Sequence, residues 1–330
     1  MDGKIKIAMF DTKPFDKESF DKYNGKSVVI RYFDAKLDES TARLTKGFDC
    51  VVIFVNDEVT EKVIETLVKY KVKLLALRCA GYNNVDLKSA EGKINVVRVP
   101  AYSPRAVAEH TVAMLMTSVR RIHKAYNRTR EYNFSLDGLK GFELYGKTIG
   151  VIGAGKIGRS FIEICNGLGM RVLYYDKFVN EIINAEKVQL KKLFIESDVI
   201  SLHCPLSEDN YHMINEKTIA IMKMGVIILN TSRGALIDAE DLLEGIKSKK
   251  IGAACLDVYE EETDIFFSDR SGHILKDDIL ARLLTMPNVI LTSHQAFLTE
   301  EALANIAETT VANIIKFFEG EKIPKDNLVI

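Results

Sequence analysis

The sequence predicts an α/β protein built on parallel sheets. Short apolar runs alternate with amphipathic segments along most of the 330 residues, which is typical of βα units packed around a parallel sheet. The alternation stops once, between about residues 103 and 147, and then starts again. A chain of this length is expected to form about two domains, each large enough to bury a core without disulfide bonds or a structural metal.

The first hundred residues are expected to form one sheet, with helical segments such as 58–70 between its strands. The expected strands are 4–10, 27–33, 50–55, 73–77 and 95–99. Ser103 and Pro104 then supply a helix N-cap and a proline at the first helical position. We therefore expect one long helix from there to about Arg130, at a domain boundary.

After a loop that contains three glycines, at 138, 141 and 146, the alternation continues to the end of the chain. The expected strands are 148–152, 171–175, 198–203, 225–230, 252–257 and 288–292. Six strands with helices between them predict a complete doubly wound domain. A second long amphipathic helix is expected from about Thr299 to Gly320.

Composition excludes several classes of protein. The chain has 45 Lys and Arg against 46 Asp and Glu, so no overall charge favours nucleic acid or an anionic membrane as a partner. The five cysteines are scattered and form no CxxC pair, and no His or Cys residues have the spacing of metal ligands, so we expect buried thiols and no metal. The longest uncharged run, 283–299, is too polar to cross a bilayer, and early charges at Asp2, Lys4 and Lys6 argue against a signal peptide. We expect a soluble, cytoplasmic protein.

A glycine pattern after one expected strand points to a dinucleotide. Gly153, Gly155 and Gly158 form GxGxxG between a strand and a helix, where glycines permit a tight turn and a close approach of the backbone to pyrophosphate. Asp176 ends the next strand, where a carboxylate can accept hydrogen bonds from ribose and repel a 2′-phosphate. The pattern therefore favours NAD over NADP, although Lys177 weakens that preference. The alternative is a tight turn in a fold that binds no nucleotide.

Other polar residues follow the later strands, at the sheet edge where parallel α/β proteins bind their ligands. An arginine, carboxylates and a histidine at one edge suit the oxidation of an alcohol or the reduction of a carbonyl. Each also has an ordinary structural interpretation: Arg233 as a surface cation, Glu262 as a solvated acid, His294 as a structural histidine. The other histidines are assigned no role. The residues at this edge are Cys204, Pro205, Asn210, Thr231, Ser232, Arg233, Asp257, Glu260, Glu261, Glu262, Ser293 and His294.

The segments 230–238, 256–262 and 293–299, together with the glycine turn at 153–158, resemble the D-isomer-specific 2-hydroxyacid dehydrogenases. Two longer stretches, 125–158 and 197–215, are similar to the branch of that family that forms D-lactate in bacterial fermentation. The resemblance implies two Rossmann-like doubly wound domains separated by a cleft. It also implies a discontinuous substrate domain, 1–101 plus 299–330, around an NAD-binding domain, 102–298, in a homodimer or homotetramer.

The resemblance also implies roles for individual residues. Arg233 would bind the substrate carboxylate, His294 would exchange the proton, and Glu262, five residues after Asp257, would be its acidic partner in preference to its neighbours in the acidic run. The residues implied to bind substrate are Cys79, Ala80, Gly81, Tyr102, Arg233, His294 and Phe297. The residues implied to bind NAD are Gly153, Gly155, Lys156, Ile157, Gly158, Asp176, Cys204, Pro205, Asn210, Thr231, Ser232, Arg233 and Asp257.

The implied reaction is the reversible reduction of pyruvate to D-lactate with NADH. Two alternatives remain open at this point. The chain could act on another 2-hydroxy acid, such as hydroxyisocaproate, hydroxypyruvate or glyoxylate, because a methylene more or less in a pocket changes binding by only about 1–3 kcal/mol. It could also be an NAD(H)-sensing corepressor that binds without turnover, because a fold does not determine a function.

Overall fold

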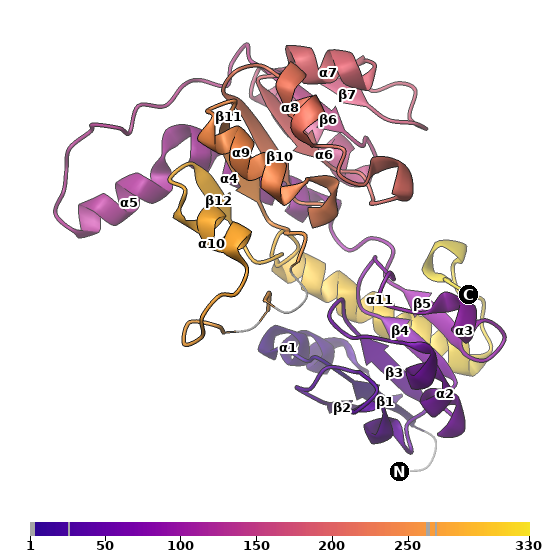
Figure 1. The fold of residues 1–330 in the computed structure, drawn as a ribbon. Coiled ribbons are helices and arrows are strands. Elements are labelled where there is room, and N and C mark those ends of the chain that lie inside the picture. The colour runs from indigo at the N-terminus through magenta and orange to yellow at the C-terminus, as the bar shows by residue number, and fades with distance from the viewer. Residues whose placement is uncertain (1–3, 26, 262–264, 268) are drawn as a thin grey trace. The chain divides into compact units, whose positions relative to one another are not determined.

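The chain folds into two compact units, each built on one parallel sheet (Figure 1). The computed structural model describes residues 4–25, 27–261, 265–267 and 269–330. The first unit is Met1–Ser103 with Phe297–Ile330, and the second is Pro104–Ala296. The predicted α/β class with two parallel-sheet domains is confirmed.

The first unit contains a five-stranded sheet in the order β2-β1-β3-β4-β5, with all pairs parallel. Its central strands β3 and β4 are buried along their whole length, because helices cover both faces of a parallel sheet. Every strand expected in this half is present. The strands are β1 (Ile5–Met9), β2 (Val28–Tyr32), β3 (Cys50–Ile53), β4 (Leu74–Leu77) and β5 (Asn95–Arg98).

Helices from both ends of the chain cover this sheet. The C-terminal helix α11 (Glu300–Glu319) packs against α1 and β4. It begins after Thr299, whose hydroxyl accepts a hydrogen bond from the Ala302 amide, and it ends at Gly320 in the left-handed conformation. These are the ends expected from the sequence. The other helices of the unit are α1 (Pro14–Tyr23), α2 (Glu61–Lys69), α3 (Leu87–Ala90) and the 3-10 turns η1 (Ala42–Thr45) and η5 (Lys325–Asn327).

A buried ionic cluster lies after the carboxyl ends of β1, β3 and β4. The Arg78 guanidinium, 1% exposed, bonds the Asp16 carboxylate at 2.9 Å and lies over the Phe54 ring at 4.3 Å. Asp57 accepts the backbone N–H groups of Leu37 and Phe54, each at 2.6 Å. Burial raises the pKa of Asp57 to about 7 despite these bonds. The loops that follow these strands are therefore held by buried polar groups.

The second unit contains a seven-stranded sheet in the order β12-β11-β10-β9-β6-β7-β8. The six strands expected from the sequence are present. The short edge strand β8 (Glu186–Lys187) was not expected, because its two residues are exposed and charged and form no apolar run. The expected strands are β6 (Thr148–Ile152), β7 (Arg171–Tyr175), β9 (Val199–Leu202), β10 (Val226–Asn230), β11 (Ile251–Leu256) and β12 (Val289–Leu291).

The expectation of one continuous helix from Pro104 to about Arg130 is wrong. The structure has two helices, α4 (Pro104–Arg120) and α5 (Ile122–Arg130), separated by Arg121 in the left-handed conformation, with φ of 55°. The helix α4 buries eight residues against the unit, whereas α5 buries none. The break lets α5 and the following loop extend away from the second sheet (Figure 1).

The remaining helices of the second unit connect its strands. They are α6 (Lys156–Gly167), α7 (Leu190–Glu196), α8 (Glu216–Ile221), α9 (Ala239–Lys247), α10 (Asp278–Thr285) and the 3-10 turns η2 (Glu208–Asn210) and η3 (Gly234–Leu236). Among the described residues, no helix has the length and apolar character needed to cross a bilayer. All five cysteines are free thiols; Cys204 is partly exposed and the others are buried.

Candidate active site

The glycine turn between β6 and α6 has little space for side chains. Gly153 has φ of 93°, and a Cβ there would lie 2.6 Å from the backbone of His203 and Cys204. A Cβ at Gly158 would lie 2.1 Å from the Gly153 carbonyl oxygen. Gly153 therefore permits the turn and Gly158 the close approach of the helix to it.

Gly155 has a different role from the other two glycines. A Cβ built on it meets nothing within 4 Å, so the fold itself does not require a glycine at this position. Gly155 is the N-cap of α6 and has no side chain to accept bonds from the first turn, where Lys156 and Ile157 lie. The amide groups at this helix N-terminus donate no hydrogen bond to an N-cap side chain, and glycine leaves room for a ligand to approach them. Such amides can bind an anionic group such as pyrophosphate. The residues present therefore fit a dinucleotide.

Asp176 follows β7 and is held against this turn. One of its carboxylate oxygens accepts the Ala154 amide at 2.7 Å, and the other accepts the amides of Phe178 and Val179. Burial opposes ionisation, but these backbone bonds hold the pKa of the Asp176 carboxyl below its usual range. Lys177 pairs with Asp209 at 2.8 Å. The edge of the site therefore carries an ionised carboxylate beside the turn, and the adjacent cation is already paired.

The loop after β9 is tied to the loop after β10. The Asn210 side chain donates to the Pro205 carbonyl at 2.8 Å and also contacts the Cys204 sulfur. The Ser232 hydroxyl donates to the Cys204 carbonyl at 2.5 Å. Burial raises the pKa of Cys204 to about 11, so its thiol stays protonated at neutral pH. Four of the predicted cofactor residues thus form one hydrogen-bonded group.

Arg233 and Thr231 follow β10. The Thr231 hydroxyl hydrogen-bonds the Thr111 hydroxyl of α4 at 2.9 Å. The Arg233 guanidinium donates to the Ser232 carbonyl at 2.7 Å and is partly exposed. A Cβ on Gly234 would lie 2.1 Å from the Tyr259 backbone, so this loop packs directly on the chain after β11. Arg233 is therefore held beside the segment that leads into the acidic run.

Asp257, which follows β11, organises the segment that carries His294. Its buried carboxylate accepts the Gln295 and Ala296 amides at 2.9 and 2.8 Å and the Thr292 hydroxyl at 2.5 Å. Its carbonyl accepts the His294 amide at 2.7 Å. Burial opposes ionisation, but hydrogen bonds from His110, Thr292 and the backbone hold the Asp257 pKa below its usual range. The ionised carboxylate thus fixes a loop in which His294 has φ of 52°.

Two histidines to which the sequence assigned no role have polar partners here. His110 of α4 lies 3.5 Å from the Asp257 carboxylate and 3.3 Å from the Thr292 hydroxyl. His212 lies between two carboxylates, with Nδ1 at 3.1 Å from Asp238 and Nε2 at 2.6 Å from Glu260. These contacts join segments far apart in the chain, and no local sequence pattern indicates them.

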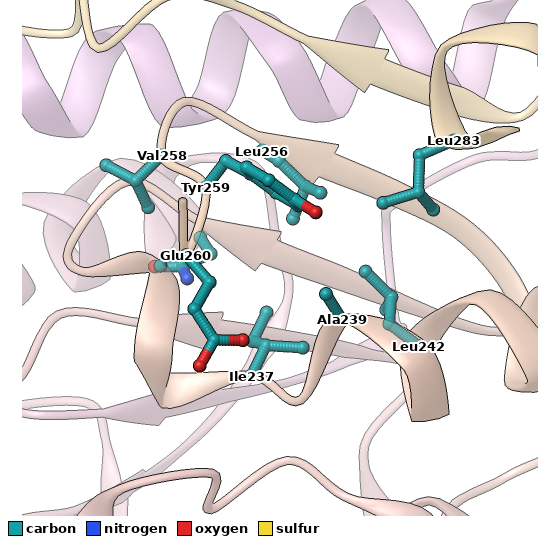
Figure 2. Close-up of a pocket in the computed structure, with 10 residues that line it drawn as sticks. Ile237, Ala239, Leu242, Leu256, Val258, Tyr259, Glu260 and Leu283 are labelled. Carbon is teal, nitrogen blue, oxygen red and sulfur yellow. The ribbon is translucent and has the colours of Figure 1, made fainter. Parts of the chain in front are cut away.

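Glu260 begins the acidic run and lies against a small cavity (Figure 2). The cavity has a volume of about 10 Å³, room for at most one water molecule, so it is no site for a nucleotide. Ile237, Leu242, Leu256 and Leu283 line it, and Figure 2 shows the Glu260 side chain beside Ile237. Glu262, the predicted acidic partner of His294, lies outside the described residues. Among those described, no group of three or more His, Cys, Asp or Glu residues could hold a metal ion.

The predicted substrate residues of the first unit fall into two groups. Cys79, Ala80 and Gly81 form a loop after β4, where the Cys79 thiol contacts the Gly81 carbonyl at 3.3 Å. Among the described residues, the buried Phe297 ring has aromatic neighbours in Tyr102 at 6.0 Å, Phe54 at 6.1 Å and Phe15 at 6.4 Å between ring centroids. Phe15 and Phe54 were not predicted from the sequence, because they lie far from Phe297 in the chain.

Comparisons with known proteins agree on one family. Residues 112–296 match the family model described as "D-isomer specific 2-hydroxyacid dehydrogenase, NAD binding domain". A "2-hydroxyacid dehydrogenase homolog" of Haemophilus influenzae is 52% identical over 322 residues, covering 96% of this chain and 97% of its own. The "D-lactate dehydrogenase" of Escherichia coli is 50% identical over 327 residues, covering 98% and 99%. The apo structure of D-lactate dehydrogenase from Escherichia coli aligns with a TM-score of 0.90 at 48% identity, covering 99% of this chain and 100% of that one.

The glycine turn gives a test of cofactor binding that separates folding from affinity. We expect Gly158→Ala to lower the thermal unfolding temperature, because its Cβ meets the Gly153 carbonyl. We expect Gly155→Ala to unfold like the wild type but to bind NADH at least about tenfold more weakly, because its methyl occupies the approach of the pyrophosphate. NADH fluorescence titration and thermal unfolding measure the two effects. Unchanged NADH affinity in Gly155→Ala would contradict the assignment of the pyrophosphate to this turn.

Proposed function

The chain belongs to the D-isomer specific 2-hydroxyacid dehydrogenases, and from that premise we propose that it is an NAD-dependent D-lactate dehydrogenase that reduces pyruvate reversibly to D-lactate. The observation that carries the proposal is the edge of the second sheet. There the glycine turn, the ionised Asp176, Arg233 and His294 follow the parallel strands β6, β7, β10 and β12 of a domain that matches the NAD-binding domain of the family.

The cofactor is assigned to the second unit. The first turn of α6, with Lys156 and Ile157, is proposed to bind the pyrophosphate, and Asp176 the adenosine ribose. The hydrogen-bonded loops after β9 and β10 are proposed to line the rest of the cofactor, through Cys204, Pro205, Asn210, Thr231, Ser232 and Arg233. Asp257, predicted as a further cofactor residue, is proposed to act mainly by holding the His294 segment, because its carboxylate already accepts bonds from that segment.

The substrate is assigned a carboxylate site and a proton donor. Arg233 is proposed to bind the pyruvate carboxylate, because a guanidinium fork matches two carboxylate oxygens. The backbone of Cys79, Ala80 and Gly81 is proposed to supply further donors. Tyr102 and Phe297 are proposed to line the space for the substrate methyl, and the aromatic rings around Phe297 favour a short side chain.

The chemistry divides between the cofactor and the protein. NADH, when bound, supplies the hydride that reduces the carbonyl carbon. His294 is proposed to donate a proton to the developing alkoxide, and Arg233 to stabilise its negative charge. Glu262 is proposed to favour the protonated imidazole before transfer. The hydrogen bonds of Asp257 limit the movement of the His294 backbone, so the imidazole stays near one position during the reaction.

A panel of 2-oxo acids tests the proposed activity. NADH absorbance followed with pyruvate, 2-oxoisocaproate, hydroxypyruvate and glyoxylate should give the highest kcat/KM for pyruvate, by about tenfold over an acid that differs by one methylene. Chiral analysis of the product should show D-lactate. Preference for a bulkier acid would change the substrate within the family, whereas no oxidation with any of them would overturn the enzymatic proposal.

The proposed acid–base pair is tested by two substitutions. We expect His294→Gln to lower kcat for pyruvate reduction by about 10²–10⁴-fold, because the amide cannot donate a proton to the alkoxide. We expect Glu262→Gln to move the pH profile of reduction to lower pH, because loss of the carboxylate disfavours the protonated imidazole. Steady-state rates between pH 5 and pH 9 measure both. Near-normal turnover in the first variant, or an unmoved profile in the second, would contradict the role assigned to that residue.

We also propose that the protein forms a homo-oligomer through its second unit. The helix α5 buries no residue in its own unit, and the chain after it exposes large apolar side chains. Tyr132 is 87% exposed, Leu136 81% and Phe134 71%. Monomers rarely expose so many large apolar residues in one segment without a partner.

Light scattering should give a mass of at least twice the 37.1 kDa of one chain. The double substitution Tyr132→Ser with Phe134→Ser should lower this mass, because it removes apolar surface from the proposed interface. A monomeric wild type would contradict the proposal.

A further inference from the structure

The carbonyl groups of the loop after β4 all have partners on the first unit itself. The Cys79 carbonyl accepts the Val99 amide at 3.2 Å, and the Ala80 carbonyl accepts the Arg98 guanidinium at 3.0 Å. The Gly81 carbonyl lies 3.3 Å from the Cys79 thiol. We call residues 79–81 the substrate loop, because the proposed function assigns their backbone to the substrate carboxylate.

These carbonyl contacts determine where the amides of the loop point. In a planar trans peptide the C=O of one residue and the N–H of the next point in opposite directions. Fixing the Cys79 carbonyl against Val99 therefore directs the Ala80 amide away from β5. Fixing the Ala80 carbonyl against Arg98 directs the Gly81 amide away from Arg98. The direction of each of these two N–H donors is thus fixed, one by the Val99 amide and the other by the Arg98 guanidinium, and backbone N–H groups of fixed direction can bind a carboxylate.

Arg98 is the one side chain among these anchors that reaches the loop from another strand. It lies at the end of β5. Its guanidinium donates to the Ala80 carbonyl and to the Asp326 carbonyl, the latter at 3.3 Å, and lies over the Tyr82 ring, 5.1 Å from the guanidinium carbon to the centroid. A guanidinium can satisfy two carbonyls and a ring at once because its donors form a rigid planar fork. Arg98 therefore connects the substrate loop to residues 313–330, which we call the C-terminal segment.

The C-terminal segment also holds the backbone of β5. The Asn313 side chain of α11 donates to the Arg98 carbonyl at 3.0 Å, and Asn327 donates to the Asn313 side chain at 2.8 Å. The Val329 amide donates to the Val96 carbonyl at 2.9 Å. Both the main chain and the side chain of Arg98 are consequently fixed from the same segment.

We propose that Arg98 is a positioning residue for substrate: by fixing the Ala80 carbonyl, its guanidinium holds the Gly81 amide in the direction that binds the substrate carboxylate. The inference rests on the proposed function and extends it. Arg98 is not proposed to contact the reacting atoms. Because Arg98 orders the loop before substrate binds, less conformational entropy is lost on binding. The affinity for the substrate carboxylate should therefore depend on Arg98.

The test separates substrate binding from chemistry and from folding. We expect Arg98→Met to raise the KM for pyruvate by about tenfold while kcat changes by less than about twofold, because the carboxylate contact is equally present in the ground state and the transition state. The KM for NADH should stay at the wild-type value, because NADH binding is assigned to the second unit. A purely structural defect lowers the active fraction, and hence apparent kcat, without this change in pyruvate KM.

Arg31→Met is the matched control. Arg31 lies on β2 of the same unit, and its guanidinium lies over the Phe33 ring at 5.1 Å, the distance found for Arg98 and Tyr82. The control removes the same charge and a similar ring contact without touching the substrate loop. It should leave the KM for pyruvate unchanged, and an equal rise in the control would overturn the proposal.

Arg98→Lys separates geometry from charge. A lysine keeps the positive charge but lacks the planar fork, so we expect the KM for pyruvate to rise by about threefold. A wild-type KM in Arg98→Lys would mean that charge alone matters and would overturn the proposal, as would a wild-type KM in Arg98→Met. If Arg98→Met does not fold, as judged by thermal unfolding, Arg98→Lys decides alone. A wild type inactive with every 2-oxo acid instead defeats the proposed function, and this inference with it.

Discussion

The buried carboxylate of Asp257 carries the hydrogen bonds on which the candidate site of the second unit depends. It accepts two backbone amides and a hydroxyl from segment 292–296, while its own carbonyl accepts the His294 amide. An ionised carboxylate that lost these donors inside the protein would be strongly disfavoured, so the segment and the charge stabilise each other. The loop after β12 is thereby held to the loop after β11, and the position of His294 follows from a residue that is itself inaccessible to solvent.

In both units, buried charged groups hold the loops that follow the strands. Parallel strands bring the loops at their carboxyl ends to one edge of the sheet, where such groups can contact them. In the second unit those loops carry Asp176, Arg233 and His294. In the first unit they carry a buried cluster, in which Arg78 pairs with Asp16 and Asp57 binds two backbone amides, and the substrate loop follows directly after Arg78. The two edges differ in what they offer a ligand. In the proposed site, the second unit would present charged or proton-donating side chains. The first would present backbone N–H groups whose direction is fixed by the hydrogen bonds of the preceding carbonyls.

Apolar periodicity was sufficient to predict the sheets, because a buried strand of a parallel sheet must be apolar along its length. It missed β8, which is exposed and charged, and it gave no warning of the break at Arg121, where neither a glycine nor a proline interrupts the pattern. The glycine turn was predictable because each glycine lies within six residues of the others. The contacts of His110 and His212 were not, since their partners lie 147 and 48 residues away in the chain and only the folded sheet brings them together.

The balance of 45 cationic and 46 anionic residues conceals how differently individual arginines are used. Arg78 is buried against Asp16 and stacks on Phe54, so its charge is neutralised inside the first unit. Arg98 donates hydrogen bonds to two backbone carbonyls. Arg233 donates to the carbonyl of the preceding residue, Ser232, and remains partly exposed. A guanidinium serves all three purposes because it stays charged, stacks on rings and donates in a fixed plane. A bulk charge near zero therefore says little about the site. The sequence alone points to Arg233 as the functional cation, whereas in the structure Arg78 directly precedes the substrate loop and Arg98 donates to the Ala80 carbonyl of that loop.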